Sequence, residues 1–154
     1  MSQPLAINPR IVEALYCEAL VLSDEVRHVF ALSGRLERAG AEEDLARVAL
    51  SAEGLRTTTR MMHSIAWLLN HRAFFMGEIS ELQLRRHGRL SPAFRRIDPD
   101  QVALLSPDTA DLVQRTQRYY DRLLRLDQAW RLTGPGQPSA IERLRERIEG
   151  RLAG

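Results

Sequence analysis

The side chains best suited to chemistry in this sequence are two histidines on one predicted helix. His63 and His71 lie eight residues apart, with Arg60 and Trp67 close to them in sequence. A helical metal site favours histidines four residues apart with acidic or cysteine ligands, and Glu78 is the only nearby acid. The spacing therefore favours hydrogen-bonded histidines at a surface or an interface over a metal site.

Phosphotransfer on a helical bundle is a second chemistry for His63, or for His28. A phosphorelay histidine typically has a lysine and small residues one turn away, whereas Trp67 follows His63 and all 22 basic residues are arginine. The lack of lysine also excludes Schiff-base chemistry and a Walker A motif. No Ser-His-Asp set, glycine-rich phosphate loop or carboxylate pair is visible, so we expect no catalytic, cofactor-binding or metal-binding residues and no enzyme activity. Acid-labile phosphate on His63 would reveal the phosphorelay alternative.

An arginine-rich stretch could bind a partner. No acid lies between Glu81 and Asp98. The candidate partner loop consists of Arg85, Arg86, Arg89, Phe94, Arg95 and Arg96. Arginine makes bidentate contacts with carboxylates, so an acidic protein surface fits this loop, with Phe94 as an apolar anchor. A solvated loop is the plain alternative, and nucleic acid is a weaker one because the net charge is only +2 and aromatic residues are not interleaved.

The composition is that of an ordinary soluble protein, with 44% hydrophobic and 27% charged residues among 154. This length is typical of one domain. No apolar run is long enough to span a membrane, and the polar start has no signal-peptide core, so we expect a cytoplasmic protein. The single cysteine, Cys17, cannot form an internal disulfide, and we expect it to be a buried small hydrophobe.

Capping residues and apolar spacing predict three long helices. Asn8 and Pro9 begin the first, acidic residues 42–44 begin the second, and Ser106 with Pro107 begins the third. Residues 88–107, with three prolines, are expected to form a long loop. The sequence predicts an all-α fold, an antiparallel three-helix bundle with long helices over residues 1–133. A short C-terminal helical tail, opened by a Ser139–Glu142 capping box, is expected within residues 134–154.

The second helix has two distinctive faces. One is an apolar row in alternating three- and four-residue steps: Leu45, Val48, Ala52, Leu55, Thr59, Met62, Ala66, Leu69, Ala73 and Met76. This spacing is typical of a helix packed on other helices, so we assign the row to the core of the bundle. The opposite face carries two large aromatic residues and is the candidate dimer or partner interface: Arg56, Arg60, His63, Trp67, His71, Phe74 and Glu78. A homodimer is the common way to cover such an extra face.

The same helix resembles the central helix of the RcdA family, small helical proteins of alphaproteobacteria. The resemblance rests on LRTTTRMM at 55–62, AWLL at 66–69, HRA at 71–73 and GE at 77–78. It implies a dimeric three-helix bundle. It also implies an adaptor for the AAA+ protease ClpXP, with a receiver-domain protein, the unfoldase and cargo such as cell-cycle regulators as partners. The conspicuous motif residues are Arg56, Arg60, Trp67, Arg72 and Glu78, and helix packing is the simplest role for them.

Overall fold

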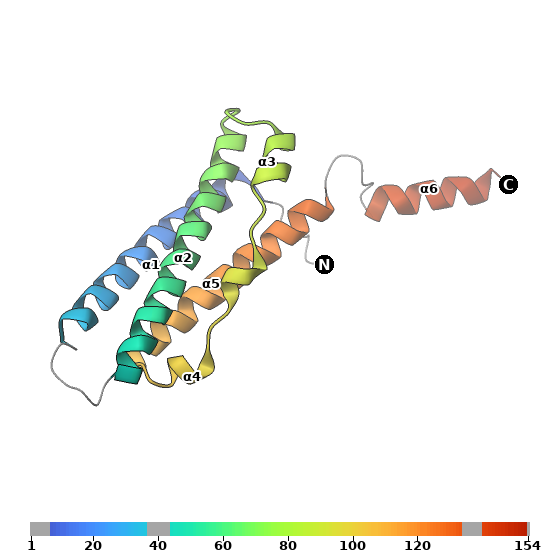
Figure 1. Ribbon diagram of the computed structural model, residues 1–154. Coiled ribbons are helices and arrows are strands. Elements are labelled where there is room, and N and C mark those ends of the chain that lie inside the picture. The colour runs from blue at the N-terminus through green and yellow to red at the C-terminus, as the bar shows by residue number, and fades with distance from the viewer. Residues whose placement is uncertain (1–6, 37–43, 134–139, 154) are drawn as a thin grey trace.

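A computed structural model describes residues 7–36, 44–133 and 140–153, and every element in these ranges is a helix. Three helices are long: α1 (Pro9–Leu36), α2 (Asp44–Phe75) and α5 (Pro107–Leu132). The shorter ones are α3 (Glu81–His87), the 3-10 turn η2 (Pro92–Arg95), α4 (Pro99–Val102) and α6 (Ala140–Leu152). Figure 1 shows the long helices packed together, with the shorter helices α3 and α4 beside them.

The helix ends confirm the predicted caps. The Asn8 side chain accepts from the backbone N–H of Ile11 at 2.9 Å, and Pro9 is the first residue of α1. Ser106 caps α5 in the same way, with Pro107 following it. Gly77, with φ +77°, follows the last turn of α2, where the N–H of Glu78 returns to the carbonyl of Ala73. These local signals set where the long helices begin and end.

The long helices do not all alternate in direction. Glu18 and Glu25 of α1 pair with Arg122 and Arg115 of α5, so these two helices are antiparallel. α2, however, runs parallel to α5, because Arg60 bonds to Thr116 and Trp67 bonds to Asp127. The expected antiparallel bundle is therefore wrong for this pair.

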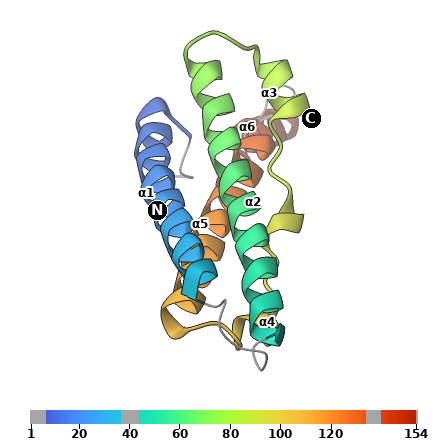
Figure 2. The ribbon, with the colours of Figure 1, turned by 60° about the vertical axis from the view of Figure 1, so that its left-hand side comes forward.

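The connection between α2 and α5 explains their parallel direction. It returns along the bundle from the end of α2 to the start of α5, and Figure 2 shows it beside α2. α3 begins it with a capping box between Ser80 and Gln83. The expected long loop at 88–107 contains two short helical turns, η2 and α4, which begin with Ser91–Pro92 and Asp98–Pro99.

The hydrophobic core lies between α1, α2 and α5. One apolar stripe of α1 faces this core, since Val12, Leu15, Ala19, Leu22 and Val26 are all buried. α5 contributes a buried face of its own, which includes Leu112, Thr116, Tyr119, Tyr120 and Leu123. Burial raises the pKa of Tyr120 to about 12, and its hydroxyl donates to the carbonyl of Ser91 in the connection.

Cys17 does not belong to this core. Its side chain is exposed, beside Val21 and Tyr119, at an open groove between α1 and α5. The expectation of a buried cysteine is wrong, because Cys17 falls between the core positions Leu15 and Ala19 on α1 and lines the open groove instead.

The C-terminal helix α6 extends away from the long helices (Figure 1). Its side chains Leu144, Ile148 and Leu152 are exposed in a row along one side. The predicted capping residue Ser139 and the side chain of Glu142 lie outside the described residues. Within the described ranges, no helix combines the length and the apolar character that crossing a membrane requires.

Candidate protein-interaction surfaces

The polar and aromatic face of α2 is buried against the rest of the chain. The fully buried side chains of α2 include Glu53, Thr57, Arg60, Ser64 and His71, and Trp67 is 2% exposed. The sequence predicted this face as a dimer or partner interface, and the prediction is wrong for Arg60, Trp67 and His71. Polar groups enter a protein core only when other groups replace their contacts with water. The partners of Arg60 and Trp67 lie far away in sequence.

Arg60 holds the connection between α2 and α5 in place. Its Nε donates to the carbonyl of Phe94 at 2.8 Å, and Nη2 donates to the carbonyl of Arg96 at 3.0 Å. Nη1 donates to Oγ1 of Thr116 on α5 at 2.8 Å. Burial lowers the pKa of the Arg60 guanidinium, while Glu53 opposes that shift. A guanidinium stays charged under ordinary conditions, so these are charge-assisted bonds that fix residues 94–96 against α2 and α5.

Trp67 is fixed by a buried carboxylate. Its indole Nε1 donates to Asp127 Oδ1 at 3.0 Å, and Asp127 is 3% exposed. The other oxygen of Asp127 accepts from the backbone N–H of Leu90 at 3.4 Å and from Arg131 Nε at 3.1 Å. Asp127 therefore joins α2, α5 and the connection, and three donors satisfy a charge that burial would otherwise make costly.

His71 lies between two tryptophan rings. The ring centroids are 4.2 Å from Trp67 and 5.2 Å from Trp130, and neither imidazole nitrogen has a hydrogen-bond partner among the described residues. Burial lowers the pKa of His71 to about 4, although Asp127 opposes this shift. The imidazole is therefore neutral near pH 7 and serves as a packing group.

The remaining members of the predicted interface do not form one patch. His63 is exposed and stacks on Phe94 at 4.0 Å between ring centroids. Arg56 bonds to Glu53 and, at 2.7 Å, to Gln101 of α4. Phe74 is half-buried beside Phe75, and Glu78 is exposed after the end of α2. All of the predicted residues except Glu78 thus lie on α2, and the structure divides them between the core and the surface.

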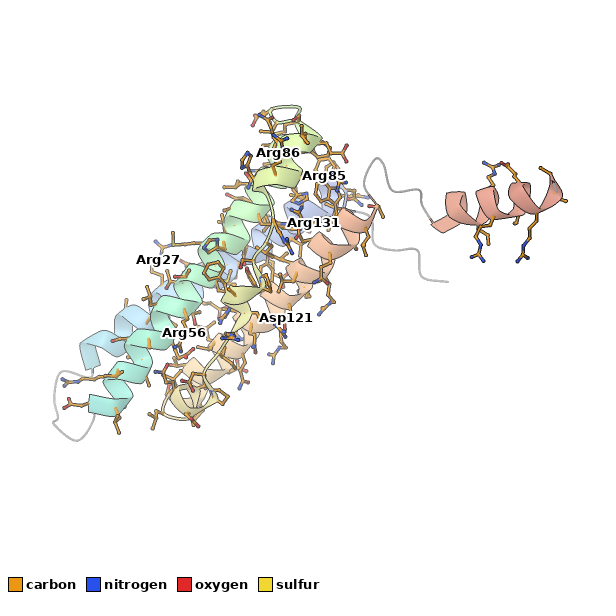
Figure 3. The ribbon with its side chains drawn as sticks, turned by 45° about the vertical axis from the view of Figure 1, so that its right-hand side comes forward. Arg27, Arg56, Arg85, Arg86, Asp121 and Arg131 are labelled. Carbon is orange, nitrogen blue, oxygen red and sulfur yellow. The ribbon has the colours of Figure 1, made fainter. Side chains whose placement is uncertain are left out.

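The arginine-rich stretch is partly committed to contacts within the chain. Arg85 pairs with Glu81 at 3.1 Å and lies over the Trp130 ring, and its carbonyl accepts from Arg131 (Figure 3). Arg95 pairs with Asp121 at 2.9 Å. Phe94 is half-buried rather than an exposed anchor.

Three arginines of this stretch stay exposed. Arg86, Arg89 and Arg96 have no ion pair with another described side chain. Arg96 lies between two open hollows, one of which is also lined by Leu55 and Thr59 of α2. The sequence prediction of a partner loop thus reduces to these three cations, spread over residues 86–96.

The apolar row of α2, assigned to the core from the sequence, is instead exposed. Its large side chains and their exposed fractions are Leu45 77%, Val48 60%, Leu55 70%, Met62 65%, Leu69 41% and Met76 66%. The small residues between them are partly or fully exposed: Ala52, Thr59, Ala66 and Ala73. We call these ten residues the α2 seam. Figure 2 shows α2 in front of α5, with α1 to one side and the connection to the other. The exposed fractions show that the described chain leaves the large side chains of the seam uncovered.

The α2 seam has the properties of a protein-binding surface. Monomeric proteins rarely expose large apolar patches, and here six large apolar side chains of one helix are 41–77% exposed. The assignment of this row to the core of the bundle is therefore wrong, because its large side chains are exposed in the described chain. Among the described residues, no three His, Cys, Asp or Glu side chains are grouped in a way that could hold a metal ion.

Comparison with known protein families identifies a match over nearly the whole chain. The model of a family described as protein of unknown function, DUF1465, matches residues 4–152. A search of curated proteins found no match, and a search of solved structures found none.

Proposed function

We propose that this chain, which belongs to the DUF1465 family of proteins of unknown function, is a non-enzymatic protein-interaction module that binds through the α2 seam. The observation that carries the proposal is the exposure of the seam. Its large side chains are 41–77% exposed along the whole of α2, while charged residues of the same helix are buried. Burying apolar surface contributes roughly 25 cal/mol per Å², so a complementary helix gains considerable free energy by covering this row.

A second apolar surface suits a protein that links two partners. Leu144, Ile148 and Leu152 of α6 are exposed on a helix that extends away from the bundle (Figure 1). The spacing of these residues is typical of an amphipathic helix that docks into a groove of another protein. The bundle and the tail can then engage different proteins at once.

The resemblance to RcdA extends the proposal to a specific role. We infer that this chain is an adaptor in regulated proteolysis, which delivers cell-cycle regulators to ClpXP together with a receiver-domain protein. An adaptor acts by tethering, because linking cargo to a protease raises the effective concentration of the cargo without any chemistry of its own. The exposed Arg86, Arg89 and Arg96 would add contacts with acidic side chains of a partner.

A reconstituted binding assay tests this role. The immobilised chain is incubated with purified ClpX and the receiver-domain partner, separately and together, and the retained proteins are quantified. We expect the wild-type chain to retain these proteins, and the retained amount to fall at least tenfold when Met62→Arg is introduced into the seam. Val21→Arg is the matched control, because Val21 is 64% exposed on α1 and Met62 is 65% exposed on α2. If the wild-type chain retains neither protein, the adaptor role is wrong.

A further inference from the structure

The open groove between α1 and α5 is a surface apart from the α2 seam. Residues of α1 and α5 line it, and none of its lining residues belongs to α2. Its base holds Leu22 and Tyr119, which are 8% and 3% exposed, and the Tyr119 hydroxyl donates to the carbonyl of Leu15 at 2.6 Å. Val21 lines the groove from α1 and is 64% exposed. The groove therefore combines a fixed base with apolar surface that solvent reaches.

Two ion-pair bridges link the α1 side of this groove to the α5 side. Glu18 of α1 accepts from Arg122 of α5 at 2.8 and 3.2 Å. Glu25, seven residues further along α1, accepts at 2.8 Å from Arg115, seven residues further back along α5. The two antiparallel helices thus keep one register, in which an acid of α1 meets an arginine of α5 every two turns.

Two other arginines of the same α5 row have no acid opposite them. In the register of the bridges, Arg118 lies level with Val21 and Leu22 of α1. Arg125 lies level with Ala14. Both arginines are exposed, and neither forms an ion pair with another described side chain. Two of the four cations in the row are therefore left for a carboxylate that this part of the chain does not supply.

We propose that the groove binds an amphipathic helix of a partner protein, whose acidic residues pair with Arg118 and Arg125. Apolar side chains of that helix rest on Val21 and on the base of the groove, in the manner of a helix docked into a groove of another protein. The carboxylates complete the row of ion pairs, since arginine binds carboxylates in bidentate geometry. This inference is independent of the proposed function, because it uses a different surface.

The spacing of the two unpaired arginines identifies a helix as the occupant. Their seven-residue separation corresponds to about 10.5 Å along α5, at a rise of about 1.5 Å per residue. A helix that runs along the groove repeats the side chains of one face at the same interval, so acids two turns apart reach both arginines. An extended strand rises about 3.3 Å per residue, so residues three apart would cover the distance but point to opposite faces.

The acids of α1 distinguish this partner from a nucleic acid. Glu18 and Glu25 line the same groove as the arginine row. Their carboxylates repel a phosphate backbone, which carries negative charge along its whole length. An amphipathic helix can place its acids against α5 while an uncharged or basic flank lies along α1. The mixed charge of the groove therefore favours a peptide.

Fluorescence anisotropy with a defined probe tests the groove. The probe is a labelled amphipathic helical peptide with leucine along one face and glutamate beside it at two-turn intervals. We expect the wild-type chain to bind the probe, and the double variant Arg118→Gln with Arg125→Gln to bind it at least about tenfold more weakly, because two charge-assisted pairs are lost. A wild-type chain that does not bind the probe overturns the inference.

The matched control is the double variant Arg27→Gln with Arg147→Gln. It removes the same charge from two exposed arginines that do not line the groove. We expect it to bind the probe as the wild type does. Equal losses in the two double variants would mean that net charge alone attracts the probe, and the inference would fail.

Val21→Glu tests whether a missing acid leaves Arg118 available. The substitution places a carboxylate level with Arg118 inside the groove, so that the chain itself supplies the ion pair. We expect probe binding to be lost while urea unfolding shows a stably folded protein. Unchanged probe binding by Val21→Glu would show that the probe binds elsewhere.

A single-stranded oligonucleotide replaces the peptide in a parallel titration. We expect no binding that depends on Arg118 and Arg125. Oligonucleotide binding that is lost in Arg118→Gln with Arg125→Gln would make the groove a nucleic-acid site and would overturn the inference.

Two variants separate this inference from the proposed function. Val21→Glu should lose the probe but keep retention of ClpX and the receiver-domain partner, whereas Met62→Arg should lose retention but keep the probe. If the wild-type chain binds the probe as expected but retains neither protein, only the adaptor role fails. If the probe does not bind while retention depends on Met62, only the groove inference fails.

Discussion

The two faces of α2 combine side-chain chemistry and burial in opposite ways. One face carries Glu53, Arg60 and Trp67 and is buried, and the other carries Leu55, Met62 and other apolar residues and is exposed. The buried face is stable there because fixed partners accept its hydrogen bonds: carbonyls of the connection for Arg60, and Asp127 for Trp67. The exposed face has no such partner in the described chain.

This difference shows that the polarity of a helix face does not by itself decide which way the face points. A polar face can enter the core when its hydrogen bonds are met there, and a regular apolar face can be reserved for contact with another protein. The measurements below test this division of α2, starting with the largest expected effect.

Replacing Arg60 with methionine should destabilise the protein most. The substitution keeps an unbranched apolar chain but removes the three hydrogen bonds of a buried guanidinium, and it leaves the carbonyls of Phe94 and Arg96 without their charged donor. We expect a loss of about 3–5 kcal/mol in the free energy of unfolding. Urea unfolding at a fixed protein concentration measures it. Arg89→Met is the control, since Arg89 is exposed and should change stability by less than about 0.5 kcal/mol. Equal losses in the two variants would refute the assignment of Arg60 as a buried clamp.

His71 should make the buried face sensitive to acid. Its folded-state pKa of about 4 lies below the ordinary value of 6.5, so the unfolded chain binds the proton more tightly. The contribution of His71 to stability is therefore full above pH 6.5 and is lost as the pH falls towards 4. Between about pH 7 and about pH 4 this loss amounts to about 3 kcal/mol.

The measurement compares the pH dependence of urea unfolding in the wild type and in His71→Leu. Acidic residues contribute to both curves, and the difference between the curves isolates His71. The difference should grow as the pH falls from 6.5 to about 4 and stay constant at higher pH. Parallel curves over the whole range would mean that His71 is accessible to protons in the folded state.

The sequence predicted the local features of the fold but not the orientation of α2. Asn8, Ser106 and Gly77 act through neighbouring backbone groups, so the ends of the long helices were readable from adjacent residues. The orientation of α2 depends on contacts such as Trp67 with Asp127, 60 residues away. Helical spacing also cannot distinguish a seam that packs within the chain from one that packs on a second chain, because both use the same repeat.

The α2 seam should make thermal stability depend on protein concentration. A dimer that unfolds to two separate chains is stabilised by mass action, so Tm rises as the concentration rises. For a chain of this length we expect about 2 °C for each tenfold increase in the wild type. Met62→Arg should show no dependence, and Val21→Arg should follow the wild type. Calorimetry over a hundredfold range of concentration measures the three slopes, and a flat wild-type slope would contradict pairing through the seam.

The smallest expected effect concerns the arginines beside the buried face. Arg95 pairs with Asp121 across the surface, whereas Arg86 has no ion pair with a described residue. Arg95→Gln should cost about 0.5 kcal/mol, because a half-exposed ion pair gains little over solvation, and Arg86→Gln should cost less. Binding to an acidic partner should show the opposite order, with Arg86→Gln weakening it more than Arg95→Gln does. Of these two arginines, only Arg86 is free to contact a partner. Urea unfolding measures the stability of the two variants, and the retention assay measures their binding to the partner. If Arg95→Gln weakens partner binding more than Arg86→Gln does, the basic stretch binds as a unit, and its internal ion pairs open when a partner arrives.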